Sequence, residues 1–276
     1  PATSLLLREA DKVLINNIHD YSDWVITFDR NLGPEIYDLP GREGEIPFLL
    51  DYIPGEEVTG ISSYLTTRPT SEIVGLLGPH FREYDITVES EKDGGTLKML
   101  LEDLRAVSSS LVMQLNSGKN KAFEVVGAAF TKRVLEKKGV LTNSFLIPID
   151  LHQNLFDGLS NENKSRADHL LVNIDVDKKS IDFTVIEIKC RKYLSATDAN
   201  ELRRKMKEQM DNTIIALKEH FDPENAFSED RLDRTIKNKE LKSLLVFYIY
   251  RAVRYEQLSL NTSEHYLNFL QSLDSG

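Results

Sequence analysis

Apolar residues recur along the chain with two periods, one typical of helices and one typical of strands. In the first third, short apolar runs predict strands at residues 24–28, 48–53 and 61–65. A helical pattern covers residues 69–84, and another helix is expected to end near Asp20. Together these segments predict a small α/β unit.

The rest of the chain predicts a longer alternation of helices and strands. The expected elements are helices at 97–115 and 121–138, strands at 145–149, 168–174 and 181–189, a helix at 197–220, a buried strand at 244–250 and a helix at 261–273. The polar turn between the second and third strands predicts a hairpin, and Pro148 indicates an edge strand or a bulge. In the helix at 121–138, the predicted core-facing residues are Phe123, Val126, Phe130 and Val134.

Charge divides the chain unevenly and suggests where its domains meet. Residues 1–95 hold 7 Lys and Arg against 18 Asp and Glu, whereas residues 96–276 hold 27 against 26. The charged, glycine-ended segment 89–95 reads as a linker. We therefore expect a small acidic α/β domain over 1–95 and a second domain over 96–276. An acidic domain repels nucleic acid at long range, so any nucleic-acid contact is expected in the second domain.

Composition excludes several classes of site. The single cysteine, Cys190, excludes a disulfide framework and a multi-cysteine zinc site, and we expect it to be a small packing residue in a cytoplasmic protein. No stretch approaches the ~20 apolar residues of a membrane span, so no membrane partner is expected.

The segment 116–120 lacks the second glycine and the Ser or Thr of a phosphate-binding P-loop. The chain begins without methionine, and we expect it to be part of a longer protein.

A pattern of charged residues surrounds the predicted hairpin. Asp168 begins one strand, and Glu187 and Lys189 end the next, nineteen positions later. Glu124 lies in the preceding helix and Gln209 in the following one. The arrangement resembles the signature of the PD-(D/E)XK nucleases, the restriction-endonuclease-like and RecB-like superfamily. The resemblance covers about residues 98–255 and implies an αβββαβ core, although Ala167 stands where the family often has proline.

The resemblance implies a nuclease that hydrolyses DNA with Mg²⁺ or Mn²⁺ as its cofactor. Asp168, Glu187 and Glu124 are then the metal-binding and catalytic carboxylates, and the backbone carbonyl of Ile188 is a further ligand. Strand alternation puts Glu187 and Lys189 on one face, where the lysine can position water or neutralise developing charge. Two adjacent carboxylates form the hard, oxygen-rich site that such cations prefer.

Basic residues near this motif indicate a DNA-binding surface. The candidates are Lys121, Lys192, Arg203 and Arg204, together with Gln209 from the resemblance. Two other interpretations stay open: a Glu-x-Lys pair on a strand is often a surface ion pair, and basic runs on helices are often solvated faces. The alternative function is a catalytically silent module that keeps the fold to bind DNA or to dock a partner ATPase.

The first domain carries a second resemblance. Residues 23–30, 50–54 and 66–77, followed by the nuclease pattern, are similar to the C-terminal region of large bacterial ATPases of anti-phage defence and DNA restriction. This resemblance implies an ATPase or translocase domain in the same longer chain or complex. Cutting both strands of a duplex also favours a homo-oligomer.

Overall fold

The computed structural model describes most of the chain. The residues described are 17–30, 37, 47–53, 61–68, 70–82, 94–107, 111–112, 119–150, 152–156, 165–190, 195–222, 224–225 and 233–273. The chain divides into two compact units, residues 1–125 and 126–276, and each is treated by itself. This division falls inside helix α5 (Lys119–Lys137). The domain boundary predicted near residue 95 stays a prediction, because most of the expected linker lies outside the described residues.

The first unit contains a three-stranded antiparallel sheet with the strand order β1-β3-β2. The elements are β1 (Trp24–Asp29), β2 (Phe48–Ile53), β3 (Ser62–Thr67), α2 (Thr70–Arg82) and α3 (Gly94–Val107). The three predicted strands and the helix that follows them are therefore confirmed. Buried Arg105 of α3 donates from Nε to the carbonyl of Leu49 in β2 at 3.2 Å, which ties this helix to the sheet. The helix predicted to end near Asp20 lies mostly outside the described residues.

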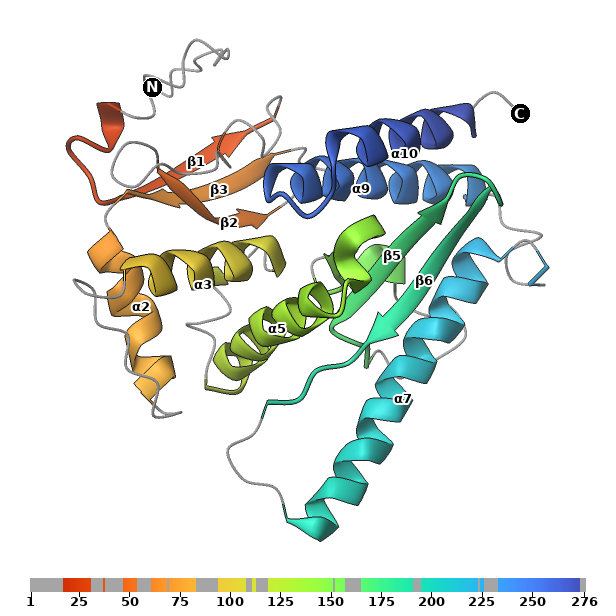
Figure 1. The fold of residues 1–276 in the computed structure, drawn as a ribbon, viewed down its shortest axis with the longest axis horizontal. Helices are drawn as coiled ribbons and strands as arrows, with labels where there is room; N and C mark the ends of the chain where they lie inside the picture. Colours follow the sequence, from red (N-terminus) through yellow and green to blue (C-terminus); the bar gives the residue numbers. More distant parts are fainter. Residues whose placement is uncertain are drawn as a thin grey trace. The chain divides into compact units, whose positions relative to one another are not determined.

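The second unit contains another three-stranded antiparallel sheet, with the order β4-β5-β6. Its β5–β6 hairpin can be followed in Figure 1. Its elements after α5 are η3 (Val140–Asn143), β4 (Ser144–Pro148), α6 (Gln153–Phe156), β5 (His169–Asp175), β6 (Ser180–Ile186), α7 (Ala196–Phe221), α9 (Arg234–Arg254) and α10 (Leu260–Ser272). The predicted hairpin is confirmed, with His169 opposite Ile186 and Asp175 opposite Ser180. Pro148 lies in β4, which is at an edge of the described sheet, as predicted. The fold is thus mixed α/β.

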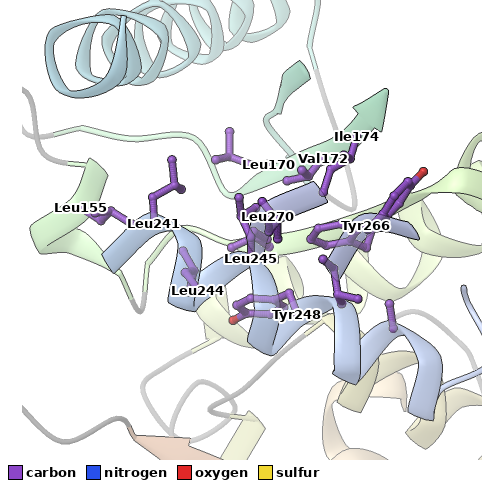
Figure 2. Packing of buried hydrophobic residues seen from close by; sticks show 14 of the residues in the cluster. Leu155, Leu170, Val172, Ile174, Leu241, Leu244, Leu245, Tyr248, Tyr266 and Leu270 are labelled. Atoms are coloured by element: carbon purple, nitrogen blue, oxygen red, sulfur yellow. The ribbon is translucent and has the colours of Figure 1, made fainter. Parts of the chain in front are cut away.

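One face of this sheet packs on helices α9 and α10. Leu170, Val172 and Ile174 of β5 belong to the same buried cluster as Leu245 of α9 and Leu270 of α10. Figure 2 shows these side chains gathered between the strand and the two helices. The alternating positions of β5 thus supply one apolar face, which is the pattern expected of a half-buried strand.

The strand predicted at 244–250 is wrong, because these residues form the middle of helix α9. The apolar run is too short for its period to separate a strand from a buried helix. Buried Leu241 precedes the run and buried Ala252 follows it, so the apolar stripe continues with helical spacing beyond both ends. The expected αβββαβ order therefore has a helix as its sixth element.

The third strand of the predicted core also ends earlier than expected. β6 stops at Ile186, whereas the sequence predicts a strand up to Lys189. The backbone amide of Ile188 donates instead to the carboxylate of Asp168 at 2.6 Å. A side-chain acceptor therefore replaces the backbone ladder at this point.

The buried face of helix α5 differs from the predicted one. Val126 is buried, as predicted, but Phe130 and Val134 are 49% and 51% exposed, and the other buried residues of this stretch are Val125, Ala128 and Ala129. The side chain of Phe123 lies outside the described residues. A Cβ atom placed on Gly127 would lie 3.0 Å from Cγ2 of Ile188. The helix approaches its neighbour through small residues, and this close approach leaves the larger apolar side chains on the outer face.

In the described part of the chain, no helix is both long enough and apolar enough to cross a membrane.

Candidate active site

Asp168 and Glu187 lie opposite each other at the open end of the β5–β6 hairpin. The last register pair is His169 with Ile186, and continuing the antiparallel register by one residue places Asp168 opposite Glu187. The next pair inward on the same face is Leu170 with Val185, both of which belong to the hydrophobic core. The two carboxylates therefore end an otherwise apolar face of the sheet.

The backbone around Asp168 is held on both sides. Its carbonyl accepts a hydrogen bond from the amide of Ile149, just beyond β4, at 3.0 Å. Its Oδ2 atom accepts the Ile188 amide at 2.6 Å. The first bond fixes the main chain, and the second fixes the direction of the carboxylate.

Glu187 carries its carboxylate in a fully buried position, with a side-chain exposure of 0%. Nζ of Lys189 forms an ion pair with Oε1 of Glu187. Apart from this ion pair, neither Glu187 oxygen accepts a hydrogen bond from a described residue. Burial, and after it the nearby Asp168 carboxylate, raises the pKa of Glu187 to about 7, against the lowering effect of Lys189. Such a site favours a bound proton or a cation.

Side chains alternate between two sides of the segment after β6. Glu187 and Lys189 meet in their ion pair, as the sequence predicts. Ile188 and Cys190 face helix α5, since a Cβ on Gly127 would lie 3.0 Å from Ile188 Cγ2 and 3.2 Å from Cys190 Cβ. This contact is consistent with the expected packing role of Cys190.

Glu124 lies on helix α5, three positions before Gly127, and its side chain is half-buried. Residues three apart share a helix face. Glu124 belongs to the first unit and the Asp168–Glu187 pair to the second, so its place beside that pair stays a prediction. Among the residues that the structure describes, no three His, Cys, Asp or Glu side chains form a metal-binding group.

The predicted DNA-binding residues fall in different settings. Arg203 and Arg204 are exposed on helix α7, where Arg204 lies 3.6 Å from Glu208 in an ion pair one turn along. Lys121 lies on α5 with its side chain outside the described residues, and Lys192 lies wholly outside them. DNA contact by these residues stays a prediction.

Gln209 makes a specific contact that the sequence does not reveal. Its Nε2 atom donates to the carbonyl of Arg166 at 2.8 Å, two residues before Asp168. Two further α7 residues that sequence patterns did not single out, Asn212 and Thr213, contact the same segment. Their helical spacing from Gln209 is the signal in the sequence that could have identified them.

The residues present fit a hard divalent cation in their chemistry. Asp168 and Glu187 supply carboxylate oxygens, and the Glu187 oxygens are buried with Lys189 as their compensating charge. Mg²⁺ binds through one or two carboxylates and takes its remaining oxygen ligands from water or substrate. Two facing carboxylates therefore satisfy the protein's share of such a site.

No protein-family model, curated protein or solved structure matches this chain.

Proposed function

We propose that the chain is a metal-dependent nuclease that hydrolyses phosphodiester bonds in DNA. The observation that carries this proposal is the buried Glu187 carboxylate, facing Asp168 across the hairpin end and paired with Lys189. Burying charged groups at the end of an apolar strand face costs free energy. Such costly arrangements of charge cluster at functional sites, which favours a catalytic role for these two carboxylates and the lysine. Supporting this, the order α5-β4-β5-β6-α7, interrupted only by the four-residue helices η3 and α6 in the described chain, is similar to the first five elements of the PD-(D/E)XK core. Helix α9 in place of the final strand is a departure from that core.

Each residue has a role in this proposal. Asp168, Glu187 and the carbonyl of Ile188 would hold Mg²⁺ or Mn²⁺, with Glu124 as a further ligand or as the base. A bound cation of this kind supplies Lewis-acid stabilisation of charge on the attacked phosphate. Lys189 keeps a positive charge at Glu187, where it can offset negative charge that develops on the phosphate. The core behind Leu170 and Val185 keeps water away from one side of the pair.

The proposed setting is bacterial anti-phage defence or DNA restriction, with an ATPase or translocase domain as partner. It is supported by the resemblance of residues 23–30, 50–54 and 66–77, followed by the nuclease pattern, to such proteins.

The decisive experiment is cleavage of supercoiled and linear DNA with EDTA, Mg²⁺ or Mn²⁺. Glu187→Gln removes the charge and keeps the shape, and Glu264→Gln, exposed on α10, is the matched control. We expect cleavage that needs the cation, is lost in Glu187→Gln and is retained in Glu264→Gln. Cleavage by Glu187→Gln at the wild-type rate contradicts the assigned site.

A catalytically silent module is the second candidate, because the Lys189 ion pair already compensates the buried Glu187 carboxylate. That candidate predicts DNA shifted in a gel with no cleavage in any cation, and no Mn²⁺ binding that depends on Glu187.

A further inference from the structure

Three polar side chains on one face of helix α7 form hydrogen bonds with the backbone just before Asp168. Gln209, Asn212 and Thr213 have the i, i+3, i+4 spacing of helical neighbours. Gln209 Nε2 donates to the Arg166 carbonyl at 2.8 Å. Asn212 Nδ2 donates to the carbonyl and the hydroxyl of Ser165 at 3.3 and 3.0 Å. Residues 165–167 belong to no helix or strand, so these side chains supply hydrogen bonds that a sheet would otherwise provide.

Thr213 makes the contact nearest to Asp168. Its hydroxyl accepts the amide of Ala167 at 2.9 Å and donates to the carbonyl of Gln209 at 3.0 Å. Because the donated bond fixes the hydroxyl proton, a lone pair is directed at the Ala167 amide. Both Thr213 and Ala167 are completely buried, so water cannot replace this bond.

The Thr213 contact and the sheet hold Asp168 from two directions. Ala167 is tied to α7 through Thr213, and the carbonyl of Asp168 is tied to Ile149. Side-chain rotation is then the main freedom left to Asp168, and the Ile188 amide fixes the carboxylate. The orientation of the carboxylate opposite Glu187 therefore depends on a hydroxyl that holds the residue before it in the chain.

We infer that Thr213, with Asn212 and Gln209, is a positioning residue that holds the Asp168 carboxylate in the geometry needed to bind a divalent cation with Glu187. This inference rests on the proposed function, since it gives these three side chains a role only if the carboxylate pair binds a cation. Groups that orient a metal ligand without touching the metal commonly change metal affinity by about ten- to a hundredfold.

The test is Mn²⁺ affinity of the full chain, measured by electron paramagnetic resonance of free Mn²⁺ at fixed pH. Thr213→Val keeps the side-chain shape and removes the hydroxyl, and we expect Mn²⁺ to bind about tenfold more weakly. Thr213→Ser keeps the hydroxyl and should restore the affinity. Thr131→Val is the matched control, because the Thr131 hydroxyl also donates to the carbonyl one turn earlier, that of Gly127, at 2.9 Å. Its Mn²⁺ affinity should equal that of wild type.

The outcomes separate this inference from the proposed function. A folded Thr213→Val with wild-type Mn²⁺ affinity overturns the positioning role and leaves the proposed metal site intact. Thr213→Ser as weak as Thr213→Val also overturns it, because the hydroxyl is then not responsible. If Thr213→Val does not fold, Asn212→Ala replaces it and must weaken Mn²⁺ binding in the same direction. Wild type that binds no Mn²⁺, or binds it equally after Glu187→Gln, overturns the proposed function and this inference with it.

Discussion

The amide of Ile188 donates to the carboxylate of Asp168 across the open end of the β5–β6 hairpin, at 2.6 Å. Beyond the last backbone pair of the hairpin, a hydrogen bond to a side chain therefore joins the two chain segments. A neutral donor orients a carboxylate without adding a positive charge that would compete with a cation. The contact thus lets one residue serve both the fold and the proposed site.

Asp168→Asn separates these two roles. The asparagine amide still has a carbonyl oxygen that can accept the Ile188 amide, so we expect a melting temperature within a few degrees of wild type. Cleavage should fall by about a hundredfold or more, because the ionised ligand is lost. Melting curves and cleavage assays on the same preparation check both parts. A large loss of stability with cleavage retained would contradict the assignment of Asp168.

Glu187 should make the metal-free protein less stable as the pH rises. Its pKa is about 7 in the folded protein, against 4.5 for a freely exposed glutamate such as that of the unfolded chain. The folded state therefore holds a proton that the unfolded state releases, and stability falls between about pH 4.5 and pH 7 and then levels. The glutamine of Glu187→Gln does not titrate. The free energy of unfolding of wild type should therefore fall by on the order of 2 kcal/mol relative to that of Glu187→Gln over this pH range.

Denaturant unfolding in EDTA at several pH values measures this difference. The control is Glu264→Gln, whose pH dependence should follow that of wild type. A constant difference between wild type and Glu187→Gln would show that folding does not shift the pKa of Glu187, and would contradict this prediction.

Gly127→Ala should destabilise the protein although alanine favours helices. Its Cβ would meet Ile188 Cγ2 at 3.0 Å and Cys190 Cβ at 3.2 Å, and overpacking of this kind costs about 1–3 kcal/mol. Gly75→Ala is the control, because Gly75 lies in helix α2 with nothing within 4 Å of a new Cβ. That variant should gain up to about 1 kcal/mol from helix propensity. Equal stabilisation of both variants, measured by chemical denaturation, would contradict the close approach of α5.

Arg203 and Arg204 should contribute to DNA affinity through phosphates. The double change to alanine is expected to weaken binding and to reduce the slope of log affinity against log salt by about 2 on duplex DNA. Fluorescence anisotropy from low to moderate salt measures that slope. Lys178→Ala, 80% exposed at the hairpin turn, is the control and should leave the slope unchanged. An unchanged slope in the double variant would make this part of α7 a solvated face.

Local patterns in the sequence were sufficient for much of this structure. The hairpin, the edge strand with Pro148 and the helix predicted at 197–220 follow from alternation, turn residues and helical periodicity. The Asp168–Glu187 pair follows from the hairpin register. The helical structure of residues 244–250 could not be predicted in this way. A short apolar run fits a strand and a buried helix equally well, and only packing against its neighbours separates the two.

The remaining features depend on contacts that the sequence does not encode locally. The end of β6 is set by a bond between Ile188 and Asp168, which are twenty residues apart. The buried face of α5 is set by how closely Gly127 approaches Ile188. The hydrogen bond from the Ala167 amide to the Thr213 hydroxyl joins residues 46 positions apart. Each of these features depends on a tertiary contact, and the local sequence on either side is compatible with more than one outcome.

The pairing of Lys189 with Glu187 also bears on how a polyanion approaches the site. Two ionised carboxylates would repel DNA, but here one of them is matched by a lysine and holds its proton up to near neutral pH. The metal-free site therefore presents little excess negative charge, and under the proposed function DNA would not need a divalent ion in order to approach it. In the proposed nuclease, DNA and the divalent cation could then bind in either order, and cleavage of bound DNA would begin only when the cation binds.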